Sequence, residues 1–240
     1  MNAGIASLAA LLDRSDIWRG GAPSRTGPPA IPSGFPELDA ELPGGGWPVG
    51  ALTEIFPEHE GIGELRLLGP ALAALSGRSL RLAWIAPPYL PYPPALAAAE
   101  IDISRLIIVR AHAKDALWAA EQALLSNACG AVLAWPQTVK YAELRRLQIA
   151  AEGGQAPAFI FRSPQTAGES SPAALRIALG TKQGGLALRV FKRRGAPLAS
   201  PILLPAMPPA ARARSSNRHV DRHSISAAAS RDLPARLLHA

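Results

Sequence analysis

The chain has 240 residues, of which 48% are hydrophobic, and its formal net charge at pH 7 is +7. This length and composition allow one sizeable folded domain with flanking segments, and they exclude a wholly disordered protein. No apolar run approaches the ~18 residues of a membrane-spanning helix. Cys129 is the single cysteine, which excludes an internal disulfide and a cysteine metal cluster and favours a cytoplasmic protein.

Positive charge is concentrated in the C-terminal third. Residues 170–220 contain no Asp or Glu, whereas the rest of the chain is nearly neutral. Nine basic residues fall in this stretch: Arg176, Lys182, Arg189, Lys192, Arg193, Arg194, Arg212, Arg214 and Arg218. This asymmetry favours contact with nucleic acid or with an acidic protein partner, while a compositional bias toward arginine explains it equally well.

Residues 1–30 predict an N-terminal helix and a linker. Leu8, Leu11 and Leu12 lie at helical spacing within residues 3–12, and the stretch lacks the charged start of a signal peptide. Residues 19–33 are rich in Gly, Pro and Ser, as linkers are. Two interpretations of the helix stay open: it docks on another protein, or it folds back on its own core.

Residues 31–204 predict one α/β core. A turn, a short helix and a glycine run lead into the first strand, and short apolar strands then alternate with helices, which indicates a mainly parallel sheet covered on both faces. The expected strands are 52–56, 80–86, 106–109, 130–135 and 156–161, and the expected helices are 64–75, 114–126 and 141–151.

The end of the chain departs from this alternation. Residues 175–179 and 186–191, joined through 181–185, predict an antiparallel hairpin, and 202–204 a further strand. Residues 205–240 are dominated by Pro, Ala, Arg and Ser and predict a basic disordered tail.

A degenerate phosphate-binding loop follows the first strand. The segment 57–66 reads Pro-Glu-His-Glu-Gly-Ile-Gly-Glu-Leu-Arg, so Gly61 and Gly63 are followed by Glu64 and Leu65. A functional loop has Lys and then Ser or Thr at these two positions, because the lysine neutralises the β- and γ-phosphates and the hydroxyl holds Mg²⁺. Glu64 repels phosphate and Leu65 cannot bind a metal, so we expect a structural turn that starts the next helix.

Two further groups of an ATPase are missing. The strand that should end in a magnesium-binding Asp ends in Trp135 and Pro136, and the segment after the second strand, 86–88, is Ala-Pro-Pro and offers no base to activate water. Three independent losses predict a protein that is not an enzyme and that needs neither nucleotide cofactor nor metal.

Several motifs resemble those of the RecA family and, more closely, its ImuA subfamily. The opening segment Ser33-Gly34-Phe35, with Leu38 and Asp39, is similar to the start of the RecA core. The runs 42–47 (Leu-Pro-Gly-Gly-Gly-Trp), 61–66, 83–88 (Ala-Trp-Ile-Ala-Pro-Pro) and 192–195 (Lys-Arg-Arg-Gly) look like ImuA, and the resemblance covers residues 30–204. It implies a RecA-like P-loop NTPase core with a degenerate nucleotide site.

The resemblance also implies a function. ImuA proteins act in SOS-induced translesion DNA synthesis beside ImuB, an inactive relative of the Y-family polymerases, and an error-prone replicative-type polymerase. We therefore expect an accessory protein that binds an ImuB-like partner, with RecA and the polymerase as further candidates. The alternative is a SulA-like inhibitor of cell division that binds FtsZ, because segments 80–88, 131–136 and 158–164 fit either family. SulA proteins usually lack the 31–50 segment and the basic extension.

The remaining candidate residues are ones that could contact DNA or a partner protein. Lys192, Arg193 and Arg194, with Arg212 and Arg214 in the tail, could bind DNA phosphates, grip an acidic partner or form a solvated turn. Trp47 is either an exposed interface anchor or part of a covered loop. The other tryptophans of the core, Trp84, Trp118 and Trp135, are expected to be packing residues.

Overall fold

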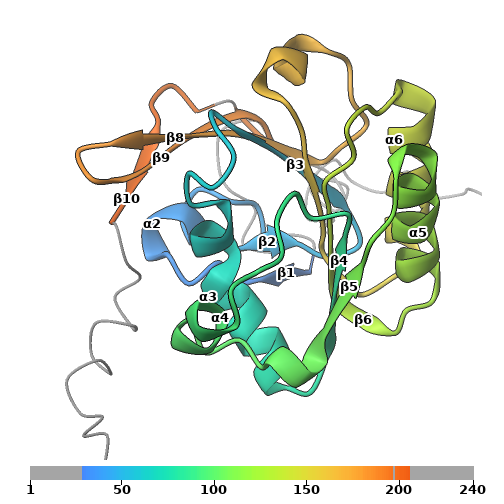
Figure 1. The fold of residues 1–240 in the computed structure, drawn as a ribbon. Coiled ribbons are helices and arrows are strands. Elements are labelled where there is room, and N and C mark those ends of the chain that lie inside the picture. The colour runs from blue at the N-terminus through green and yellow to red at the C-terminus, as the bar shows by residue number, and fades with distance from the viewer. Residues whose placement is uncertain (1–28, 197, 206–240) are drawn as a thin grey trace, which may run out of the picture.

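The computed structural model describes residues 29–196 and 198–205 (Figure 1). The predicted N-terminal helix with Leu8, Leu11 and Leu12 and the tail residues Arg212 and Arg214 lie outside the described residues. Within them, no helix has both the length and the apolar character needed to cross a bilayer.

An eight-stranded sheet forms the centre of the fold, in the order β10-β9-β8-β3-β7-β6-β4-β5. A continuous parallel part of this sheet comprises β3 (Leu52–Pro57), β4 (Arg81–Ile85), β5 (Leu106–Val109), β6 (Cys129–Ala134) and β7 (Ala158–Phe161). β8 (Leu175–Lys182) is parallel to β3, while β9 (Gly185–Lys192) and β10 (Ile202–Leu204) extend that side of the sheet antiparallel. The predicted α/β architecture with a mainly parallel sheet is confirmed.

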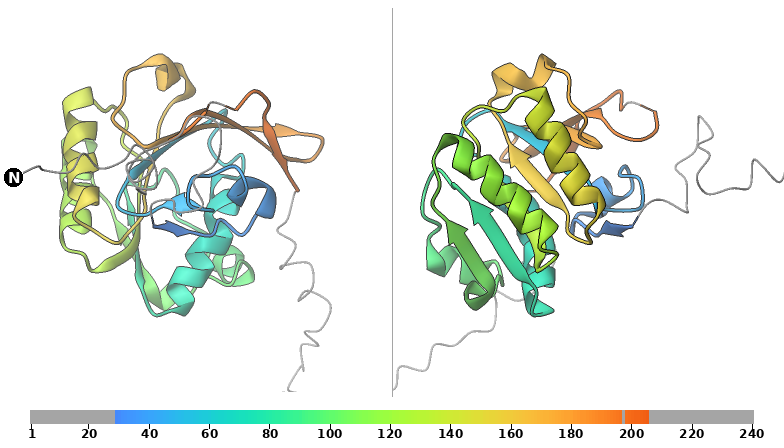
Figure 2. Two further views of the ribbon diagram at one scale, coloured as in Figure 1. Left: turned by 180° about the vertical axis from the view of Figure 1, so that it is seen from behind. Right: turned by 90° about the vertical axis from the view of Figure 1, so that its right-hand side faces the viewer.

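Helices cover both faces of the sheet (Figures 1 and 2). On one face lie α5 (Ala113–Leu125) and α6 (Tyr141–Glu152), whose buried leucines and alanines pack on β4, β6 and β7. On the other lie α2 (Pro36–Asp39), α3 (Glu64–Gly77) and α4 (Pro93–Ala98). The central strands between the two layers are mostly apolar on both sides, as is usual for a parallel sheet covered twice.

The hairpin β8–β9 turns through two residues with positive φ. Gln183 has φ 51° and Gly184 has φ 76°, which is the pattern of the tight turn that matches strand twist. The predicted hairpin is confirmed, and so is the strand at 202–204, which pairs with β9.

Several elements were not predicted. A two-stranded antiparallel sheet joins β1 (Ala30–Ile31) to β2 (Trp47–Pro48) across the glycine run. The helix α4 and the 3-10 turn η1 (Ile103–Arg105) fill the long connection between β4 and β5, and a second 3-10 turn, η2 (Pro164–Gly168), follows β7.

The structure decides the open question of Trp47 and corrects the expectation for Trp118. Of the two alternatives for Trp47, the covered loop is the one observed and the exposed interface anchor is wrong: Trp47 is 0% exposed, because pairing of β2 with β1 turns its ring inward, with its centroid 5.3 Å from that of Phe159. Trp118, expected in the core, is 62% exposed. It stands one position after the buried Leu117, and one residue turns a helix by about 100°, so its side chain points away from the sheet.

Candidate functional site

The loop between β3 and α3 is closed on the carboxylate of its own Glu64. Glu64 is the first residue of α3 and is only 7% exposed. Its Oε1 accepts a hydrogen bond from the Gly61 amide at 2.9 Å, and its Oε2 accepts one from the Gly63 amide at 3.1 Å. The carboxylate therefore stands where backbone amides at a helix N-terminus would otherwise receive an anion.

Backbone geometry explains why glycines are needed in this loop. Gly61 has φ 78° and Gly63 has φ 127°, conformations that side-chain-bearing residues rarely adopt. A Cβ on Gly63 would also lie 2.9 Å from Cδ2 of Leu186. The predicted structural turn is thus present, and Leu65 beside it is half-buried against the core.

Aromatic and proline residues follow the strands where an ATPase would carry its acidic groups. Trp135, directly after β6, stacks on Phe161 with ring centroids 4.4 Å apart and planes 6° apart, and its ring is 5.9 Å from that of Trp84. Ala86, after β4, has φ 51°, and its amide donates to the Val109 carbonyl at 2.8 Å. The predicted packing roles of Trp84 and Trp135 agree with these contacts.

A buried ion cluster, which was not predicted from the sequence, is centred on Glu54 in the middle of β3. Glu54 is fully buried; its Oε1 accepts from Arg162 Nη1 at 2.8 Å and its Oε2 from Arg176 Nε at 2.7 Å. The Arg176 guanidinium lies 5.1 Å from the ring centroid of Phe56 and 4.9 Å from that of Phe191. The cluster ties β3, β7, β8 and β9 together.

The charges of this cluster influence its neighbours. Burial acts to lower the pKa of Arg162, but hydrogen bonds from Arg162 to Glu54 and Glu169 outweigh it, so the pKa rises above its ordinary value. At the rim, burial and then the proximity of Arg176 lower the pKa of Lys192. Arg162 is therefore a fixed structural cation rather than a free one.

In the predicted basic turn, two of the three side chains bind other parts of the chain and the third is exposed to solvent. Lys192 Nζ donates to the Ser171 carbonyl at 2.7 Å. Arg193 Nε donates to the Ala196 carbonyl at 2.7 Å, while its Nη1 donates to the Glu41 carbonyl and also lies 3.2 Å from Glu41 Oε2. Arg194 is exposed and forms no ion pair with any described residue. The trio thus offers less free charge to a partner than its sequence implies.

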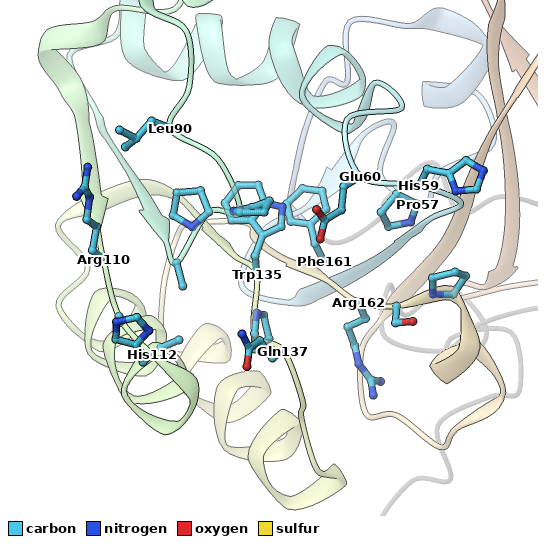
Figure 3. Close-up of a pocket in the computed structure, with 18 of the residues that line it drawn as sticks. Pro57, His59, Glu60, Leu90, Arg110, His112, Trp135, Gln137, Phe161 and Arg162 are labelled. Atoms are coloured by element: carbon cyan, nitrogen blue, oxygen red, sulfur yellow. The ribbon is translucent and has the colours of Figure 1, made fainter.

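A groove of about 820 Å³ opens at the carboxyl ends of the parallel strands (Figure 3). Its walls come from the segments after β3, β4, β5, β6 and β7. The chain leaves β4 toward α4 on one face and leaves the neighbouring β6 toward α6 on the other, and ligands of open α/β sheets bind in such a crevice. Sequence reasoning did not locate it, although the prolines and aromatics after the strands were a signal.

The described residues hold no cluster of three or more His, Cys, Asp or Glu side chains suited to a metal ion. A comparison with models of known protein families and with characterised proteins finds no match for this chain.

Proposed function

We propose that this protein is a non-catalytic adaptor of SOS-induced translesion DNA synthesis, built on a RecA-like core with a degenerate nucleotide site. The observation that carries the proposal is the hydrogen bonding of Glu64 to Gly61 and Gly63, because a carboxylate already occupies the loop amides that a nucleotide phosphate would need. A protein of this build acts by binding other proteins.

The other strand ends support the same conclusion. Trp135 takes part in an aromatic stack where a magnesium-binding carboxylate would be required, and 86–88 brings no general base. Restoring hydrolysis would need changes on three separate elements.

The choice of partner is supported by the resemblance to ImuA of the motifs at 42–47, 61–66, 83–88 and 192–195. We infer that the chain binds an ImuB-like relative of the Y-family polymerases. RecA and an error-prone replicative-type polymerase are the further candidates of the same assembly.

The test is a pull-down with the full chain as bait, offered an ImuB-like protein, RecA and FtsZ in parallel. Capture of the ImuB-like protein, weakened by deletion of residues 1–13 or 205–240, is the expected result. Capture of FtsZ alone would refute the adaptor role and identify a SulA-like division inhibitor.

An ATPase assay tests the inert loop separately. We expect no turnover above a protein-free blank, with or without single-stranded DNA. ATP hydrolysis by the unmodified chain that is lost in Glu64→Ala would show that the loop takes part in catalysis, and it would overturn the proposal.

A further inference from the structure

The groove at the carboxyl edge of the sheet has an apolar middle and polar or charged residues on its sides. Its middle is formed by the half-buried ring of Trp135, which stacks on Phe161 beneath it; Phe161 itself is only 3% exposed. Prolines stand in all but one of the segments around it: Pro57, Pro87, Pro88, Pro136 and Pro164. Because proline fixes φ, the walls are already ordered before any ligand arrives, which lowers the entropic cost of binding.

One lip of the groove displays large side chains to solvent. The proline-rich segment 86–92 carries Leu90, which lines the groove and is 61% exposed, and Tyr89 and Tyr92 beside it are also exposed. Exposed aromatic and aliphatic side chains on a stiffened loop next to a pocket are typical of protein-binding surfaces.

Charge is separated along the groove. Arg110 and His112 lie at one side and His59 and Glu60 at the other, with Trp135 and Phe161 between them (Figure 3). Arg110, Glu60 and the neighbouring Glu58 are exposed, and none of the three forms an ion pair with a described residue. Arg162 also borders the groove, but its charge is already paired with Glu54 and Glu169.

This charge pattern discriminates between ligand classes. Nucleic acids and nucleotides need net positive charge around their phosphates. Among the described residues, the unpaired charges of the groove are one guanidinium, on Arg110, and two carboxylates, on Glu58 and Glu60. The loop amides of Gly61 and Gly63 already donate to Glu64. A peptide with an acidic group near one end and a basic group near the other matches both sides at once.

We propose that this groove binds an extended peptide segment of a protein partner. A large apolar side chain of the peptide rests on Trp135 between the prolines, an acidic residue pairs with Arg110, and a basic residue pairs with Glu60. The inference rests on the proposed adaptor role only for the identity of the partner, since the groove itself defines the chemistry of the segment.

The experiment selects a display library of random twelve-residue peptides on the full chain and counter-selects on the Arg110→Glu chain. We expect enriched peptides that share one large apolar residue with an acid on one side and a base on the other. A labelled winner is then titrated against the variants by fluorescence anisotropy. Arg110→Glu and Leu90→Ser should each weaken binding about tenfold. The matched controls Arg145→Glu and Leu125→Ser, exposed on α6 and α5, should leave it unchanged.

A charge swap completes the test. Replacing the acid of the winning peptide with Lys should restore its binding to Arg110→Glu and weaken its binding to the unmodified chain. Any of three results would overturn the proposal. The library yields no enriched peptide, the peptide binds Arg110→Glu and Leu90→Ser as well as the unmodified chain, or a thymidine oligonucleotide displaces the peptide. If the groove variants capture an ImuB-like protein as well as the unmodified chain does, the adaptor role stands and the groove is not the contact site. If a peptide motif is enriched but no ImuB-like protein is captured, the peptide groove stands and the proposed adaptor role falls.

Discussion

The contact between Glu64 and its own loop predicts a specific loss of stability in Glu64→Gln. The replacement keeps the size of the side chain but removes its charge and one of its two acceptor oxygens. The amide oxygen can still accept from Gly61 or from Gly63, and the new NH₂ group then faces the other amide, donor against donor.

The magnitude follows from these contacts. A hydrogen bond to a charged group contributes about 1.5–3 kcal/mol when buried, and Glu64 is 7% exposed. A negative charge in the first turn of a helix adds roughly 0.3–1 kcal/mol. We therefore expect Glu64→Gln to lower the free energy of unfolding by about 2–3 kcal/mol, which corresponds to roughly 4–12 °C in Tm for a domain of this size.

Urea unfolding followed by circular dichroism measures this difference, with Glu60→Gln as the matched control. Glu60 stands in the same loop, is exposed and forms no ion pair with a described residue, so its substitution should change the free energy by no more than about 0.5 kcal/mol. Equal effects of the two substitutions would refute the argument that the Glu64 carboxylate closes the loop.

Three further predictions concern the rest of the core. Glu54→Gln removes the anion paired with Arg176 and one of the two anions paired with Arg162. It should cost about 3–5 kcal/mol in the free energy of unfolding measured in urea, and a loss under 1 kcal/mol would contradict the cluster. Gly46→Ala places a Cβ 2.1 Å from the Ile31 carbonyl oxygen and should cost about 1–3 kcal/mol in the same assay, more than Gly168→Ala, where no atom lies within 4 Å and φ is not positive; the reverse order would contradict the β1–β2 pairing. Burial raises the pKa of the Cys129 thiol, so less thiolate is present at pH 8 than for a free thiol. Alkylation by iodoacetamide, followed by mass spectrometry, should be slower than that of glutathione at pH 8 and should accelerate above pH 9, and equal rates at pH 8 would disprove the shift.

The sequence predicted the elements whose signal is local. The strands 106–109 and 202–204 are short apolar runs bounded by polar residues or proline, and the structure places strands at the same residues. The hairpin was recognisable because Gly184 marks its turn.

The sequence left the burial of Trp47 open and placed Trp118 wrongly, because a distant contact decides the first and a small rotation decides the second. Trp47 is buried because it pairs with Ile31 across the glycine run, a contact that no local pattern reveals. Trp118 was misplaced because one residue along a helix separates the buried side from the exposed one. In both cases residue type was a poor guide to burial.

The candidate site was predicted in part. The sequence shows that Glu64 stands where a phosphate-binding loop has lysine. It does not show that the Glu64 carboxylate accepts hydrogen bonds from Gly61 and Gly63, because this depends on the geometry of the loop. Glu54 carried a signal that was overlooked: a carboxylate flanked by apolar strand residues such as Leu52, Ile55 and Phe56 must find a cation once buried. The prolines and aromatics after the strands hinted at the groove, but its shape depends on how five separate segments converge, which no local pattern gives.

The position of β3 in the sheet has a consequence for biosynthesis. β3 lies near the N-terminus, yet both of its neighbours, β7 and β8, come late in the chain: Glu54 is 108 residues from Arg162 and 122 residues from Arg176. At a translation rate of about 5–20 residues per second, β3 emerges roughly 5–25 s before the strands that cover its two edges. During that interval a mostly apolar strand lacks its partners, and unpaired strand edges of this kind are prone to aggregation; β3 gains its second neighbour only after the synthesis of β8.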